Sequence, residues 1–375
     1  MNHIFYQTKT KYTNTGDVLI NRALIEMLRG YGSIHANCSR EVPEHFLQML
    51  GLKSSEQVFA ENELRFLGEI WKQAGQAKKN GDFVYIFSGP GELSGGNWKM
   101  AFRNAALGFL LPVLRLRGIR IVRIGRSISC VSKSMALSEW FRCLSLTHYF
   151  VRDTESVQLC KDNGIRKVKL APDLSWIYDL QHPVRINRTN KVMVSLRRSI
   201  YDHEFKEEFV EQTLQRCQEQ LALLNQAMGG KLKVCVAYQT TDDLEISTLV
   251  YERLRKLYPT EFIDHQMQIG ELETYYGAVD FHISNRMHSL LSGYKYGSLP
   301  IALVDTRRHV KIAATFRDCG LTELLFDIHN QTDEQRFCRL IDQRDEWMDR
   351  LFACEQKKIE ETVEALDSVF GVTSK

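Results

Sequence analysis

The feature that most constrains this chain is the alternation of short strand-like runs with helix-sized amphipathic stretches. Runs rich in β-branched and aromatic residues lie at residues 3–7, 83–88, 119–124, 148–151, 167–170, 192–196, 232–237, 261–264, 279–283 and 300–304. One stretch between them keeps its apolar side chains on a single helical face, at Phe205, Phe209, Leu214, Leu221, Leu224 and Met228. This alternation is typical of parallel strands joined by crossover helices, so we expect an α/β protein with two doubly wound, Rossmann-like units.

The length of the chain supports two domains. It has 375 residues, and domains usually hold roughly 100–200 residues. Residues 181–190 are polar, contain a proline and show no period, which is typical of a connection. We therefore predict an N-terminal domain over 1–184 and a C-terminal domain over 185–375, the latter ending in surface-packed helices within 332–369.

Composition excludes several classes of protein. Forty-nine basic and 46 acidic residues leave a net charge of +3 with no basic block, which argues against a nucleic-acid partner. The nine cysteines form no CxxC pair and no metal-ligand spacing, so we expect thiols in a reducing compartment and no metal site. Residues 1–17 lack the apolar core of a signal peptide, and we expect a cytoplasmic protein.

Residues 109–126 are both apolar and cationic. A buried helix followed by a buried strand is the favoured interpretation. Peripheral contact with a membrane surface is the alternative that stays open.

The most informative stretch follows the predicted strand at 279–283. Ser284 or Asn285 is expected to cap a helix there, which places Arg286 and His288 in the first turn. The carboxyl ends of parallel strands are where open α/β sheets bind ligands, and a guanidinium at a helix N-terminus suits an anion. The structural alternative is a salt-bridged Arg286 and a hydrogen-bonded core His288.

Three further basic residues follow predicted strands. We expect Arg152 either to point toward the expected cleft or to pair with Asp153. Asp153 and Thr154 are both candidates for the N-cap of the following helix. Arg197 is a candidate third anion ligand, and Lys311 either reaches the same cleft or is solvated. Residues 242–243 are two aspartates that we expect to cap a helix rather than to take part in catalysis.

Two glycine-containing loops follow strands, at 13–18 and at 88–96. Glycine allows the backbone to approach a ligand closely, but turn geometry is the favoured explanation of Gly89, Gly91, Gly95 and Gly96, and Gly16 with Asp17 equally fits the start of a helix. Asp17 stands where a helix is expected to begin.

Together these segments resemble the polysaccharide pyruvyl transferase family over about residues 10–325. The resemblance rests on Asn14-Thr-Gly-Asp17, Ser-Gly-Pro-Gly-Glu at 88–92, Val151-Arg-Asp-Thr-Glu-Ser156, Gly164-Ile165, Ala171-Pro-Asp173, Val194-Ser-Leu-Arg197, Asp280, Ser284-Asn-Arg-Met-His-Ser289 and Lys311. Two positions depart from the commoner family pattern: the loop begins Ser-Gly-Pro-Gly instead of a glycine triplet, and Asn285 precedes Arg286.

The resemblance implies two Rossmann-like domains in a GT-B-like arrangement, with the active site in the cleft between them. It implies transfer of the pyruvyl group of phosphoenolpyruvate onto a sugar of a cell-surface polysaccharide or its precursor, as a ketal, with release of phosphate. The resemblance leaves a lipid-linked, a nucleotide-linked and a polymeric acceptor open, and neither a metal nor a cofactor is expected.

The resemblance also implies roles for individual residues. His288 is the expected acid, and the residues expected to bind the donor are Arg286, Arg152, Arg197 and Lys311. The residues expected to bind the acceptor, or to be structural, are Asp17, Gly89, Gly91 and Asn285.

Two rival functions share the predicted fold. One is a GT-B glycosyltransferase that uses a nucleotide-sugar, and the other is a carbohydrate- or anion-binding protein without turnover. Fold alone does not separate these from a pyruvyl transferase.

Overall fold

The computed structural model describes residues 1–179, 188–197 and 207–372, which form two compact units. The first unit comprises Met1–Tyr12, Asp17–Tyr178 and Lys358–Lys375, and the second comprises Thr13–Gly16 and Asp179–Lys357. The expected domain boundary near residue 185 lies outside the described residues. Lys358–Lys375, which the sequence analysis assigned to the second domain, groups with the first unit.

The first unit is built on a parallel sheet. Its strands are β1 (Asn2–Gln7), β2 (Ser33–Asn37), β3 (Gln57–Val58), β4 (Phe83–Ser88), β5 (Gly91–Gly95), β6 (Arg120–Val131), β7 (His148–Val151) and β8 (Val168–Leu170). They run in the order β3-β2-β1-β4-β6-β7-β8, with β5 paired to β6. The order along the chain reverses between β1 and β4, which is the switch point at which such sheets bind ligands.

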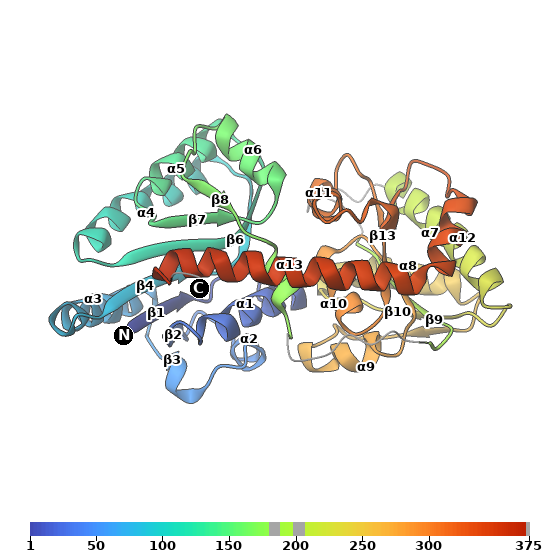
Figure 1. The fold of residues 1–375 in the computed structure, drawn as a ribbon, viewed down its shortest axis with the longest axis horizontal. Coiled ribbons are helices and arrows are strands. Elements are labelled where there is room, and N and C mark those ends of the chain that lie inside the picture. The colour runs from blue at the N-terminus through green and yellow to red at the C-terminus, as the bar shows by residue number, and fades with distance from the viewer. Residues whose placement is uncertain (180–187, 198–206, 373–375) are drawn as a thin grey trace. The chain divides into compact units, whose positions relative to one another are not determined.

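Helices surround this sheet (Figure 1). They are α1 (Thr15–Leu28), α2 (Glu44–Met49), α3 (Glu63–Asn80), α4 (Trp98–Leu116), α5 (Lys133–Cys143) and α6 (Thr154–Asp162). Four of these helices have an N-cap residue whose side chain accepts a hydrogen bond from a backbone N–H of the first turn. These N-cap residues are Asn62, Asn97, Ser132 and Asp153. The role expected for Asp153 as a cap is thus confirmed.

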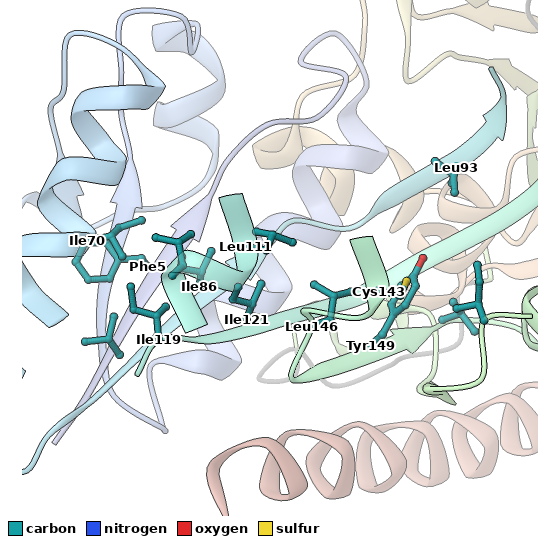
Figure 2. Close-up of a cluster of buried hydrophobic side chains, with 14 of the residues drawn as sticks. Phe5, Ile70, Ile86, Leu93, Leu111, Ile119, Ile121, Cys143, Leu146 and Tyr149 are labelled. Carbon is teal, nitrogen blue, oxygen red and sulfur yellow. The ribbon is translucent and has the colours of Figure 1, made fainter. Parts of the chain in front are cut away.

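The core of the first unit lies between the sheet and its helices. Figure 2 shows part of it, where Phe5, Ile86 and Ile121 of neighbouring strands lie near Ile70 of α3 and Leu111 of α4. Burial of such side chains is the main favourable contribution to folding.

The cationic and apolar stretch 109–126 forms the end of α4 and the start of β6. The expected buried strand is confirmed, since Ile121, Val122 and Ile124 are all buried. The expected buried helix is wrong for one face of α4, because Phe109 and Leu116 are exposed.

The second unit carries a second parallel sheet. Its strands are β9 (Lys191–Ser195), β10 (Lys233–Val236), β11 (Thr260–Phe262), β12 (Phe281–Ser284), β13 (Leu299–Val304) and β14 (Leu325–Asp327). The order is β11-β10-β9-β12-β13-β14, which is the 3-2-1-4-5-6 order of a dinucleotide-binding sheet. The order reverses between β9 and β12.

The helices of this unit are α7 (Glu207–Ala227), α8 (Leu244–Leu254), α9 (Leu272–Tyr276), α10 (Met287–Lys295), α11 (Val310–Asp318), α12 (Glu334–Asp342) and the first part of α13 (Arg344–Phe370). The predicted apolar face of α7 is buried at Phe209, Leu214, Leu221 and Leu224. Phe205 lies outside the described residues.

The prediction of an α/β protein with two doubly wound units is confirmed. Every predicted strand is present, with ends shifted by a few residues. The sequence analysis missed β2, β3, β5 and β14, which are short or rich in polar residues and glycine. The loop expected over 88–96 is therefore wrong over Gly91–Gly95, which forms β5 against β6.

Candidate functional site in the second unit

The candidate site lies where the strand order of the second sheet reverses. β9 ends at Ser195 and is followed by Arg197, while the neighbouring β12 ends at Ser284 and is followed by Arg286 and His288. Parallel strands bring these two carboxyl ends to the same edge of the sheet, where Rossmann-like folds bind anionic ligands.

Asn285 joins the two strand ends instead of capping α10. Its Oδ1 accepts the backbone N–H of Arg197 at 2.7 Å, and its Nδ2 donates to the Arg197 carbonyl at 3.4 Å. The N-cap position belongs to Arg286, whose N–H is accepted by Ser284 Oγ at 3.1 Å. The expectation that Ser284 or Asn285 is the N-cap residue is therefore wrong, because Asn285 finds a buried tertiary partner.

Arg286 forms an ion pair with Asp243. Asp243 is 2% exposed and Arg286 is 18% exposed, so the pair is largely shielded from water. Asp243 occupies the N-cap position of α8, as expected, but its side chain makes no capping hydrogen bond. The expectation that its carboxylate caps the helix is therefore wrong. A guanidinium carries five N–H donors, so one carboxylate orients Arg286 without exhausting it.

His288 packs against the backbone of Thr13–Gly16, which belongs to the second unit. A Cβ built on Gly16 would lie 2.5 Å from Nδ1 of His288. Only glycine leaves room for this approach, which accounts for Gly16 in the Asn14-Thr-Gly-Asp17 motif.

Hydrogen bonds hold Thr13–Gly16 in place. The Thr15 N–H donates to the Gln239 carbonyl at 3.0 Å, and Thr15 Oγ1 donates to the Met267 carbonyl at 2.7 Å. Asn14 forms a β-bridge with Thr240. Of the two interpretations of Gly16 and Asp17, the start of a helix is confirmed, because α1 begins at Thr15. The same segment places Gly16 against the imidazole of His288.

A buried hydroxyl network lies beneath the two strand ends. Ser195 Oγ is 2.8 Å from His282 Nε2 and 2.9 Å from the hydroxyls of Ser284 and Ser289. The network continues from Ser289 to the Tyr276 hydroxyl at 2.8 Å. Burial lowers the pKa of His282 to about 3, so this histidine is neutral and structural. No sequence pattern pointed to this network.

His309 is a second neutral histidine near the site. Burial, followed by the charge of Arg197, lowers its pKa to about 3. Its Nδ1 accepts the N–H of Asp305 at 3.0 Å. Because His309 is uncharged, it adds no positive charge to that of Arg197 and Arg286. Lys311 follows it in the first turn of α11 and is half-buried.

The remaining predicted residues lie in the first unit. Arg152 pairs with Asp173 at 3.0 Å, rather than with Asp153. Asp17 accepts the Thr10 hydroxyl at 3.0 Å and the Lys11 N–H at 3.3 Å.

Gly89 lies at the switch point of the first sheet. A Cβ at this position would lie 2.7 Å from Asn21 Oδ1 and 3.0 Å from the Gln7 carbonyl. The close approach of the backbone to these two groups therefore explains why residue 89 is a glycine. Gly91 begins β5. The expectation that these residues and those of the second unit share one cleft stays a prediction.

Comparison with known families decides the identity. The model of the polysaccharide pyruvyl transferase family matches residues 14–297. The chain belongs to this family. The polysaccharide pyruvyl transferases are enzymes, and the match includes Arg152, Arg197, Arg286 and His288, whereas Lys311 lies beyond it. No curated protein matches the chain.

Solved structures similar to this pyruvyl transferase confirm its GT-B-like, Rossmann-like fold. A glycosyltransferase from Rickettsia africae has 10% identity and a TM-score of 0.57, with 99% of this chain and 98% of that chain covered. The structure of S. aureus MnaA with UDP has 9% identity and a TM-score of 0.53, with 100% of this chain and 98% of that chain covered. A protein from Listeria monocytogenes that is described as a putative UDP-N-acetylglucosamine 2-epimerase has 8% identity and a TM-score of 0.54, with 99% of this chain and 97% of that chain covered. At such low identity these structures establish the fold alone.

Proposed function

We propose that this enzyme transfers the pyruvyl group of phosphoenolpyruvate onto a sugar of a cell-surface polysaccharide or its precursor, as a ketal, and releases phosphate. The observation that carries the proposal is the placement of Arg286 and His288 directly after β12, beside Arg197. This is the edge at which the strand order reverses.

The charges near this edge suit a small dianion. Phosphoenolpyruvate carries a carboxylate and a phosphate, and arginine binds both groups through paired N–H donors. Asp243 orients the guanidinium of Arg286, and Asn285 fixes the backbone of Arg197, so one guanidinium and the backbone that carries the other are in place before a ligand arrives. Lys311 and Arg152 are further proposed donor ligands.

His288 is the proposed acid. In the imidazolium form it gives a proton to C3 of the donor, which becomes a methyl group and leaves an electron-poor centre at C2. One sugar hydroxyl attacks C2 and its proton returns to the imidazole. A second hydroxyl then forms the other C2–O bond as the C2–O bond to phosphate breaks, and its proton leaves with the phosphate.

The acceptor is proposed to bind the first unit. A cavity of about 170 Å³ there is lined by Thr8, Lys9, Thr10, Tyr12, Asn37, Ser39, Glu41, Val42 and Glu63. Hydroxyl, amide and carboxylate groups of this kind suit sugar hydroxyls. Asp17 adjoins the cavity through its bond to Thr10.

The proposal uses no metal or cofactor and places the reaction in the cytoplasm. The cysteines whose side chains the structure describes are free thiols, which is typical of a reducing compartment.

The test compares His288→Ala with His265→Ala, a partly exposed histidine of the same unit. We expect His288→Ala to lose at least about a hundredfold in phosphate release while donor affinity changes less than about tenfold. His265→Ala should behave as the unmodified enzyme. Equal loss of activity in both variants, or none in His288→Ala, contradicts the proposal.

Thermal protection separates the rival functions. Phosphoenolpyruvate should raise the melting temperature of the enzyme, and Arg286→Ala should weaken donor binding by about 2–5 kcal/mol. Protection by a nucleoside diphosphate, with none by phosphoenolpyruvate, would instead favour a nucleotide-sugar glycosyltransferase. Donor binding without phosphate release from any acceptor would favour a binding protein.

A further inference from the structure

The outer faces of α4 and α5 expose large apolar side chains. These side chains, which we call the apolar patch, are Trp98, Phe102, Phe109, Val113 and Leu116 of α4, Leu137 and Trp140 of α5, and Leu144, which directly follows α5. Scattered exposed apolar residues are normal on a protein surface, whereas a contiguous group marks an interaction site.

The spacing on α4 forms one continuous stripe. The residues follow one another at intervals of four, seven, four and three positions, which at 3.6 residues per turn places them within about 60° of one another. Trp98 is 69% exposed, Phe102 and Phe109 are each 71% exposed, and Leu116 is 90% exposed. The opposite face of α4 packs inward through Ala101, Asn104, Gly108, Leu111 and Leu114.

Contacts on the inner side fix both helices. A Cβ at Gly108 would lie 2.6 Å from the Phe141 ring, so α4 and α5 pack closely. The buried Asn104 amide donates to Glu139 at 3.0 Å and accepts from Arg142 at 2.8 Å. The buried Asn104 amide is thus bonded through both its nitrogen and its oxygen, and rotating α4 to bury its apolar stripe would break these bonds.

The charge around the patch has one sign. α4 contains no acidic residue, and its exposed charges are Lys99, Arg103 and Arg115. On α5 the exposed Lys133 adds another positive charge, while Glu139 is buried and paired with Arg123. Trp, Phe and Leu on one face with Lys and Arg beside them is the composition of a helix that lies in a membrane interface.

We propose that the apolar patch docks the enzyme on the surface of a bilayer that contains anionic lipids. Apolar side chains enter the region between headgroups and acyl chains, while the flanking lysines and arginines bind the negative headgroups.

A second copy is a poorer occupant, because symmetric pairing would bring Lys99, Arg103 and Arg115 close to the same charges of the partner. Within the described residues, no helix has both the length and the apolar character needed to cross a bilayer.

This proposal is independent of the chemistry assigned to His288. Its readout is vesicle binding, which needs neither donor nor acceptor. An enzyme held at a bilayer surface is well placed to meet a sugar carried by a lipid, which is one of the acceptor classes that the resemblance leaves open.

The experiment measures co-sedimentation of the full chain with vesicles of phosphatidylcholine, with and without phosphatidylglycerol. The test variant is Trp98→Ser/Phe102→Ser/Phe109→Ser. The matched control is Phe59→Ser/Leu64→Ser, since these side chains are 75% and 77% exposed in the same unit but lie outside the patch. A charge variant, Lys99→Gln/Arg103→Gln, tests the electrostatic part.

We expect the unmodified chain to bind anionic vesicles, less so at high salt, and the test variant to partition at least about tenfold less. The control should bind as the unmodified chain does, and the charge variant should bind weakly. The control and the charge variant should keep the melting temperature of the unmodified chain, and the test variant should fold with a slightly lower one, because Phe109→Ser removes the ring contact between Phe109 and Phe141.

Three outcomes overturn the proposal. They are an unmodified chain that stays in the supernatant with anionic vesicles, a test variant that still sediments with them, and an equal loss of binding in the control. A dimer that the test variant converts to a monomer, with no vesicle binding in either form, would assign the patch to a second copy instead.

Discussion

Gly16→Ala tests how the backbone of Thr13–Gly16 positions His288. The new Cβ would lie 2.5 Å from Nδ1 and 2.9 Å from Cβ of the histidine, whereas non-bonded atoms prefer about 3.5–4.0 Å. The nearest contact is therefore about 1 Å too short, and either the imidazole or the segment must move by roughly that amount. Thr15 is tied to Gln239 and Met267, so we expect the imidazole to give way.

A displacement of about 1 Å in a catalytic group costs on the order of a hundredfold in rate. We therefore expect the kcat for phosphate release by Gly16→Ala to fall about a hundredfold, while donor affinity, which rests on the arginines, falls less than about threefold. Overpacking should also lower the free energy of unfolding by about 1–3 kcal/mol. Phosphate release, donor titration and denaturant unfolding measure these three quantities.

Two controls sharpen this test. Gly270→Ala adds a methyl group in the same unit where no atom lies within 4 Å, and it should be neutral. In a His288→Ala background the clash is gone, so Gly16→Ala should destabilise the protein by much less than it does alone. If Gly16→Ala keeps kcat within twofold, or destabilises both backgrounds equally, the proposed positioning of His288 is refuted.

The remaining predictions concern binding, stability and pH. Asn285→Ala removes the side chain that ties β9 to β12, so it should cost about 1–3 kcal/mol of stability and weaken donor binding, as unfolding and titration will measure. Glu139→Gln leaves the buried Arg123 without its carboxylate partner, and the free energy of unfolding should drop by about 3–5 kcal/mol. The pKa values of His282 and His309 are about 3 in the folded state against about 6.5 unfolded. Because the unfolded chain binds more protons between these values, the contribution of each neutral histidine to stability should be fully present above about pH 7 and fall by about 2 kcal/mol per histidine between pH 7 and 5, and His282→Gln should flatten that slope.

Local patterns made part of the site predictable. Ser284 to His288 form a strand end followed by a helix, and such a junction is visible within a few consecutive residues. The sequence alone therefore predicts that Arg286 and His288 lie at the carboxyl edge of the sheet. The alternation of strand-like runs with helix-sized stretches predicted the two Rossmann-like sheets for the same reason, because it too is visible in consecutive residues.

Tertiary partners could not be predicted in this way. Asp243 and Arg286 pair across elements that are distant in sequence, and Asn285 prefers a buried backbone partner to the cap that its local sequence favours. The buried hydroxyl of Ser195 and the neutral His309 carry no sequence signature, because serine and histidine are common in unrelated surroundings.

The hydrophobic periodicity of α4 also did not predict which of its faces is exposed. Its sequence is apolar nearly all round, so the pattern does not say which side meets the core. Only the packing of Gly108 against Phe141 shows that Phe102 and Phe109 face outward.

The most direct measurement of the central claim is a reaction in D₂O with phosphoenolpyruvate and a panel of glycosides, followed by mass spectrometry of the products. If His288 protonates C3 of the donor, the ketal product carries one deuterium in its methyl group, and His288→Ala forms it at least about a hundredfold more slowly. A product without the pyruvyl group, or an unchanged rate of ketal formation in His288→Ala, would contradict the account.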